Sequence, residues 1–232
     1  MALFRRVGKH QVTRWGKGFF LTRLCWSVQP SAERVKAVAA RLMEWYARHK
    51  RQFPWRIGMH ESWSVLVTAF LLRKTRAETV AKHYDRVLDA LSSPEKALEL
   101  GVKGIEDVLK PLGLYRVRAR QLYELAKALM EGRGGRLPGV GPYTEALVRC
   151  LSRGEPVPAV DVNVQRVVTR LFWTSDRRQV EKLASQLVEA AGTCELNLAV
   201  MDLAAFVCRA RKPRCGECPL AAYCEYARIS RS

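Results

Sequence analysis

Four cysteines near the C-terminus are the residues whose type and spacing point most directly to chemistry. Cys208, Cys215, Cys218 and Cys224 lie within 17 residues. Thiolates bind zinc and iron–sulfur clusters equally well on grounds of softness. Structural zinc sites usually pair two short clips of closely spaced cysteines, whereas only Cys215 and Cys218 form such a clip here. The spacing therefore favours an iron–sulfur cluster, with zinc as the alternative.

The rest of the cysteines are scattered along the chain. An odd total of seven, with one tight cluster, predicts a metal site in a reducing compartment and not a set of disulfides. The four clustered cysteines would all be ligands, so no coordination position is left for a substrate. The loop between Cys208 and Cys215 is rich in cations, which suits contact with phosphate; the alternative role of this loop is to stabilise the fold.

A glycine-rich hairpin precedes a predicted helix. It comprises Leu137, Pro138, Gly139, Val140 and Gly141. We expect both glycines to adopt backbone angles that a side chain would block. Backbone N–H groups of the hairpin and of the next helix could then face a phosphate oxygen. Most Gly-x-Gly pairs merely make turns, but the basic character of this chain favours DNA phosphate.

The charge of the chain limits its partners. Among 232 residues, 40 Lys and Arg outnumber 22 Asp and Glu, for a formal net charge of +18. This excess favours a polyanion, because neutralised phosphates release counterions; an anionic membrane surface is the alternative. No apolar run approaches the roughly 20 residues that span a bilayer, and no signal peptide is evident. Scarce Asn hints at a heat-adapted source.

The hydrophobic pattern predicts an all-α fold from Ser31 onward. A segment at 63–72 is apolar on every side, which indicates a central buried helix. Thr75 and Glu78 have the spacing of a capping box, and residues 154–160 form a proline-punctuated break. Residues 1–30 form a basic extension, which we interpret as a solvated tail; a DNA-binding arm and a transit peptide are the alternatives. Further helices are predicted near 94, 116–130, 142–152, 162–173, 177–191 and 197–207.

Three motifs resemble those of the helix–hairpin–helix DNA glycosylase superfamily, in its endonuclease III branch. They are LPGVG at 137–141, the segment from Val160 to Arg166, and the cysteine cluster. Within that branch, the chain is most similar to the archaeal mismatch thymine-DNA glycosylases. The supporting segments are PWR at 54–56, FLLRKT at 70–75, LGLYRVRA at 112–119 and NLAVMDLAAFVC at 197–208.

The resemblance implies two helical lobes with a DNA cleft between them. One is a six-helix barrel at about 56–155, which contains the helix–hairpin–helix. The other joins 31–55 to 156–232 and holds a [4Fe–4S] cluster on the four cysteines. The implied partner is double-stranded DNA with a mismatched or damaged base. We expect a monomer in the cytoplasm, associated with the nucleoid.

Asp161 and Tyr143 are the catalytic residues that the resemblance implies. From the residues alone, Asp161 is a helix N-cap before Val162; it also matches the family's catalytic Asp, which stabilises positive charge on the sugar. Tyr143 stands where bifunctional members carry a nucleophilic Lys, and a phenol forms no Schiff base. Lys74 and Lys82 are conceivable substitute nucleophiles. These residues imply a monofunctional glycosylase.

The target base must leave the helical stack, and the resemblance implies two candidate wedges for the space it vacates. They are the turn at Arg73, Lys74 and Thr75 and the loop at Leu114 and Tyr115; the alternatives are a solvated helix end and a core contact, respectively. Ala69 stands where adenine-mismatch glycosylases carry a Glu, which argues against adenine excision and leaves open what assists the departing base. The leading hypothesis is a glycosylase for thymine or uracil opposite guanine. The alternatives are an endonuclease III-like lyase, an adenine-mismatch glycosylase and a non-catalytic iron–sulfur DNA-binding protein.

Overall fold

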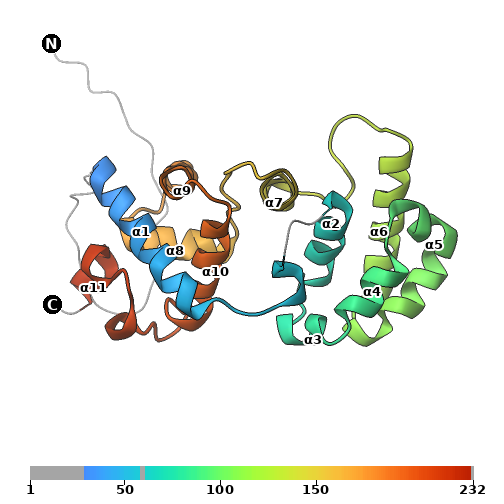
Figure 1. Cartoon of the computed structure of the whole chain (residues 1–232), viewed down its shortest axis with the longest axis horizontal. Coiled ribbons are helices and arrows are strands. Elements are labelled where there is room, and N and C mark those ends of the chain that lie inside the picture. Colours follow the sequence, from blue (N-terminus) through green and yellow to red (C-terminus); the bar gives the residue numbers. More distant parts are fainter. Residues whose placement is uncertain (1–28, 58–60, 231–232) are drawn as a thin grey trace, which may run out of the picture.

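A computed structural model describes residues 29–57 and 61–230, so nearly all of the basic extension at 1–30 lies outside the described residues. The described chain is all-α and contains no strand, which confirms the predicted fold class. Its helices form two lobes that lie side by side (Figure 1). No helix in these two ranges is both long and apolar enough to cross a membrane.

The lobe at the left of Figure 1, here called the terminal lobe, combines one early helix with the last four. It contains α1 (Ala32–His49), α8 (Val162–Phe172), α9 (Arg177–Ala191), α10 (Glu195–Phe206) and α11 (Glu225–Ile229). The other lobe, the central lobe, contains α2 (Ser62–Leu71), α3 (Ala77–Ala81), α4 (Tyr84–Ala90), α5 (Pro94–Leu109), α6 (Tyr115–Met130) and α7 (Pro142–Arg153).

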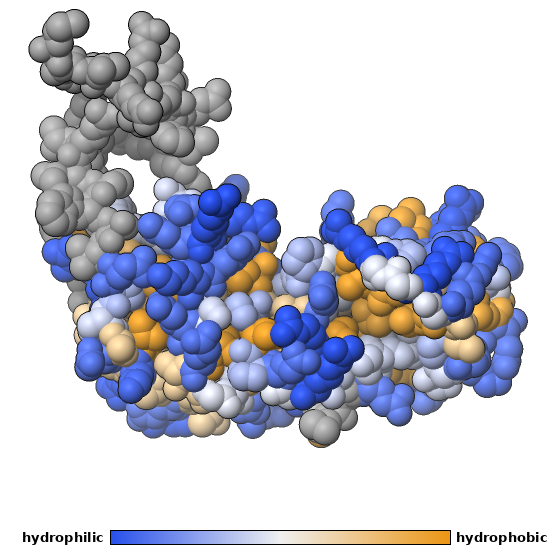
Figure 2. All heavy atoms as spheres, turned by 90° about the horizontal axis from the view of Figure 1, so that it is seen from above, coloured by the Kyte–Doolittle hydropathy of each residue, from blue (hydrophilic) through white to orange (hydrophobic). Residues whose placement is uncertain are grey.

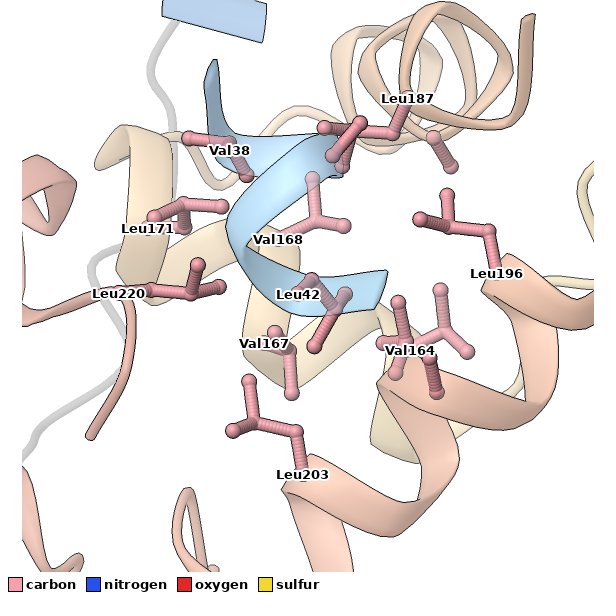
Figure 3. Close-up of a cluster of buried hydrophobic side chains, with 14 of the residues drawn as sticks. Val38, Leu42, Val164, Val167, Val168, Leu171, Leu187, Leu196, Leu203 and Leu220 are labelled. Carbon is pink, nitrogen blue, oxygen red and sulfur yellow. The ribbon is translucent and has the colours of Figure 1, made fainter. Parts of the chain in front are cut away.

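Each lobe has its own hydrophobic core. In the terminal lobe, aliphatic side chains from α1, α8, α9 and α10 point toward one another (Figure 3); Val38, Leu42, Val168 and Leu203 are at most 1% exposed. In the central lobe, α2 is buried nearly all round and contributes Phe70 and Leu71, both fully buried. The predicted central helix is thereby confirmed.

The helix starts follow local chemistry in some places and tertiary contacts in others. Ser93 caps α5 by accepting a hydrogen bond from the Lys96 backbone N–H at 3.3 Å, with Pro94 in the first turn as predicted. The predicted capping box at Thr75 and Glu78 is wrong, because α3 starts after Arg76 and has no side-chain cap. The Thr75 hydroxyl instead makes hydrogen bonds to residues near the start of α6.

A disulfide joins the two lobes. It links Cys150 on α7 to Cys194 at the start of α10, across 44 residues. The expectation that the scattered cysteines form no disulfide was therefore wrong for this pair. The third scattered cysteine, Cys25, lies outside the described residues. Because helices α7 and α10 bring these two thiols together only in the folded chain, their spacing in the sequence gave no sign of the bond.

Candidate active site

Asp161 is the N-cap of α8, at the edge of the terminal lobe. Its Oδ1 accepts hydrogen bonds from the backbone N–H groups of Asn163 and Val164, both at 2.8 Å, and its Oδ2 accepts one from the Asn163 amide at 2.8 Å. The carboxylate is half-buried. Each carboxylate oxygen can accept two hydrogen bonds, so Oδ2 keeps capacity for a further donor.

Tyr143 lies in the first turn of α7 and faces the junction of the lobes. Its hydroxyl donates a long hydrogen bond to Met201 Sδ on α10, at 3.9 Å. Burial raises the pKa of Tyr143, and the nearby charge of Asp161 raises it further. The phenol therefore stays protonated and is available as a hydrogen-bond donor, and Asp161 is close enough to affect it.

A cavity of about 130 Å³ opens beside Tyr143, between α2, α7, α10 and the linker at 50–57. Its walls are mostly apolar and aromatic, and no lysine or carboxylate is among the described residues that line it. Ala69 forms part of the wall. The lining residues are Arg51, Phe53, Trp55, Arg56, Val65, Thr68, Ala69, Leu72, Ala77, Tyr84, Tyr143, Leu147, Leu151, Leu198 and Met201.

The glycine-rich hairpin packs against the end of α2. Gly139 has a φ of +70°, and a Cβ there would lie 2.8 Å from the Phe70 ring, so this position requires glycine. Gly141 differs from our expectation, because its φ of −98° suits any residue and nothing would lie within 4 Å of a Cβ. Leu137 and Val140 pack against the central core, so the hairpin presents mainly its backbone.

Arg73 and Lys74 lie at the end of α2 and differ in exposure. The Arg73 guanidinium lies 3.9 Å from the Phe70 ring centroid and donates to the Gly139 carbonyl at 2.7 Å, so this side chain is tied to the hairpin. Lys74 is exposed and has a left-handed φ of +56°. This conformation is costly for a residue other than glycine, and such residues cluster at functional sites.

Leu114 and Tyr115 begin α6 and also differ. Leu114 is 54% exposed with a φ of +50°, whereas Tyr115 packs against the central core. Hydrophobic side chains gather over the central lobe, which contains α6, on the face shown in Figure 2. Leu114 and Lys74 are thus the exposed members of the two candidate wedges.

Arg118 holds these two loops together, although sequence reasoning gave it no role. It is 3% exposed, and its guanidinium donates to the carbonyls of Leu112 and Gly113 and to the hydroxyl of Thr75, at 3.2, 2.9 and 2.6 Å. It also donates to the Arg73 carbonyl. Burial and the charge of Arg73 lower the pKa of Arg118. Neither arginine has a carboxylate partner among the ion pairs of the described residues.

The four C-terminal cysteines form no disulfide, and Cys208, Cys218 and Cys224 pack against the terminal core. Burial raises the pKa of Cys218 to about 11, and the sulfurs of Cys208, Cys215 and Cys224 add to the shift, so all four lie near one another. This donor set suits an iron–sulfur cluster, which is held by four thiolates.

The sequence analysis also assigned no role to two buried polar residues of α10. Asp202 is 0% exposed and accepts hydrogen bonds from the guanidinium groups of Arg51 and Arg56, at 2.6 to 3.0 Å. Asn197 is 4% exposed and bonds the connector at 154–160. The sequence did contain a sign of them, since each is a polar residue inside an otherwise apolar helix. A polar residue that is buried in such a helix must have a hydrogen-bond partner.

Comparison with protein families assigns the chain to a class. Residues 67–190 match the HhH-GPD superfamily base excision DNA repair protein family, and residues 208–224 match the iron-sulfur binding domain of endonuclease III. The first match covers more than half of the chain, so the chain belongs to the HhH-GPD superfamily of base excision DNA repair proteins. The second match identifies the cysteine cluster as an iron–sulfur site.

Within this superfamily, the chain is similar to several thymine-DNA glycosylases. A thymine-DNA glycosylase of Aeropyrum pernix is 34% identical over 83% of this chain and 95% of its own. A thymine/uracil-DNA glycosylase of Methanothermobacter thermautotrophicus is also 34% identical, over 82% and 93%. The solved structure of a thermostable thymine-DNA glycosylase, 33% identical, superimposes with a TM-score of 0.79 over 85% of this chain and 98% of that one.

Proposed function

We propose that this protein is a monofunctional DNA glycosylase that removes thymine or uracil mispaired with guanine. The observation that carries the proposal is the neighbourhood of Asp161 and Tyr143 at the lobe junction, with the cavity beside Tyr143. The names of the archaeal relatives support this substrate class. We further propose that it acts as a monomer on duplex DNA.

The cavity is suited to one everted pyrimidine. An apolar cavity of about 150 Å³ can hold benzene, so a cavity of about 130 Å³ is on the scale of one six-membered ring and smaller than a fused purine ring system needs. Ala69 gives this wall no acid, and no described lining residue is a carboxylate. A purine that needs protonation would find no donor acid here, whereas thymine and uracil leave more readily as anions.

Asp161 is the proposed catalytic residue. When the N-glycosidic bond breaks, its electron pair leaves with the base and positive charge develops on the sugar. A carboxylate oxygen beside C1′ stabilises that charge and orients the attacking water, which adds to C1′ and loses a proton. The three hydrogen bonds from α8 fix the position of the carboxylate, while Oδ2 retains its remaining acceptor capacity for the water.

Tyr143 is proposed to donate a hydrogen bond to a carbonyl oxygen of the departing base. Its current acceptor, Met201 Sδ at 3.9 Å, is weak and easily replaced. Because a phenol forms no Schiff base with C1′, the product is an intact strand with an abasic site. Lys74 is on an exposed loop, and neither it nor Lys82 lines the cavity.

The remaining expected residues are proposed to bind DNA. The N-terminus of α7 has no side-chain cap at Gly141, and the open space there lets a phosphate approach the backbone. Arg73 adds positive charge without a carboxylate partner among the described ion pairs. Lys74 and Leu114, both exposed and strained, are proposed to fill the gap left by the base. The four cysteines are proposed to hold a [4Fe–4S] cluster.

The test separates base release from strand cleavage. Duplexes with G·T, G·U, A·8-oxoguanine or thymine glycol are incubated with wild type and Asp161→Asn. Wild type is expected to release thymine and uracil only, with strand breaks appearing after alkali; Asp161→Asn is expected to bind DNA but to release the base only at a slow, measurable residual rate. Unchanged release by Asp161→Asn would overturn the mechanism, and breaks without alkali would indicate a lyase.

A further inference from the structure

The connector at 154–160 is the direct covalent link between the two proposed catalytic residues. It runs from the end of α7, which carries Tyr143, to the start of α8, which Asp161 caps. It contains no helix, and Pro156 and Pro158 have no backbone N–H. A segment of this kind cannot hold its own path by regular hydrogen bonds, so its path must be set from outside.

Asn197 on α10 supplies that outside contact. Its Oδ1 accepts a hydrogen bond from the Ala159 backbone N–H at 2.9 Å, and its Nδ2 donates to the Val157 carbonyl at 2.9 Å. Asn197 thus bonds the connector as a neighbouring β-strand would, through one acceptor and one donor. Ala159 is 0% exposed, so solvent water does not reach its N–H while a side chain of the size of Asn197 fills the site.

The disulfide between Cys150 and Cys194 contacts both Asn197 and the connector. The Asn197 amide nitrogen is 3.2 Å from Cys150 Sγ, and Cys194 Sγ is 3.0 Å from the Glu155 carbonyl oxygen. The amide therefore lies between the connector and the covalent bond that ties α7 to α10. The nearer of its two hydrogen bonds to the connector, at Ala159, lies two residues before Asp161.

We propose that Asn197 is a positioning residue for base excision, which fixes the connector so that Asp161 lies at the required distance from the sugar. The proposal rests on the proposed catalytic function of Asp161. Asn197 touches no substrate. It acts on the rate because a displacement of about 1 Å in a catalytic group can lower the rate about 100-fold.

The first test is Asn197→Leu, which has a similar size and removes both hydrogen bonds. Base release from a G·T duplex is measured with enzyme in saturating excess, and affinity is measured on a duplex with an abasic site analogue. The release rate is expected to fall about 100-fold, with affinity unchanged. Val200→Ala is the matched control: it removes buried apolar volume from the same helix and should leave the release rate at the wild-type value.

A double-mutant cycle with Asp161→Asn separates positioning from general damage. If Asn197 acts through Asp161, adding Asn197→Leu to Asp161→Asn slows release no further. Multiplying effects would overturn the proposal, as would a wild-type rate for Asn197→Leu. If Asn197→Leu does not fold, Asn197→Ser replaces it, because a water can then bridge Val157 and Ala159; an intermediate loss of rate is expected, and a wild-type rate of this variant also overturns the proposal.

The cycle distinguishes this proposal from the proposed function. A fully active Asp161→Asn would refute the role of Asp161 itself. A strongly slowed Asp161→Asn together with a fully active Asn197→Leu would refute only the positioning role.

Discussion

Arg118 donates a hydrogen bond to the Thr75 hydroxyl over 2.6 Å, and this bond joins the loop of Lys74 to the loop of Leu114. The same guanidinium donates to carbonyls on both loops. A buried cation of this kind has a large desolvation cost. Its four acceptors offset that cost and fix the spacing of the two candidate wedges.

We predict that Arg118→Met lowers the free energy of unfolding by roughly 2–4 kcal/mol, since buried acceptors without donors cost about 1–3 kcal/mol each. Release of thymine should fall more on a paired G·T duplex than on a single strand, because only the duplex requires the wedges. Denaturant unfolding and single-turnover kinetics measure the two effects. Arg120→Met, at an exposed position of the same helix, is the control. An equal loss on both substrates would contradict the assignment.

The raised pKa of Tyr143 has a consequence for stability at high pH. Between the ordinary tyrosine pKa, about 10, and the raised value, the unfolded chain loses this proton and the folded chain keeps it. The unfolded state then binds fewer protons, so stability falls as pH rises through this window. The free energy of unfolding can be measured by denaturant titration at neutral pH and at a pH above the ordinary tyrosine pKa. Between these two pH values, Tyr143→Phe should lose less stability than wild type. Parallel losses in the two proteins would argue against a protonated, buried phenol.

The disulfide between Cys150 and Cys194 closes a long loop, with 44 residues of separation. By the chain-entropy model this corresponds to about 4 kcal/mol of stability. A thiol reductant should therefore lower the denaturation midpoint of wild type. The double variant Cys150→Ser with Cys194→Ser should already have the lower midpoint and not respond to reductant. A reductant effect of the same size in the double variant would assign the loss to another site.

The cysteine cluster gives a compositional prediction. The purified protein should contain roughly four iron atoms and as much acid-labile sulfide per chain, as a [4Fe–4S] cluster requires. Cys218→Ser should lose most of both. DNA affinity should fall with them, because the cationic loop at 209–214 is bounded by two of the cluster ligands, Cys208 and Cys215, and loses that anchorage with the cluster. One zinc ion per chain without sulfide would refute the cluster.

Features governed by local sequence could be predicted. The central helix follows from an unbroken apolar pattern, and the start of α5 follows from Ser93 and Pro94. Asp161 was predicted as an N-cap, and its three hydrogen bonds from α8 confirm this. The catalytic role assigned to the same carboxylate stays a prediction.

Features that depend on partners distant in the sequence could not be predicted. Thr75 has the spacing of a cap, yet its hydroxyl is bound by Arg118, 43 residues later. Asn197 and Asp202 appear in the sequence as polar interruptions of an apolar helix, and nothing local shows that they hold connectors. The exact pairing of Cys150 with Cys194 likewise depends on the packing of α7 against α10.

Helix α10 fastens both of the described crossings between the lobes. Asp202 binds Arg51 and Arg56 on the first crossing, and Asn197 binds the second. Both crossings are bonded to the same helix, α10, and the disulfide lies beside the second crossing. These contacts oppose a hinge motion between the two lobes. We therefore expect the protein to keep its shape on binding, so that the deformation needed for recognition would fall on the nucleic acid. Mispaired sites deform at lower cost than Watson–Crick DNA. Such a protein would therefore select them by their ease of deformation, before it makes any contact with the base itself.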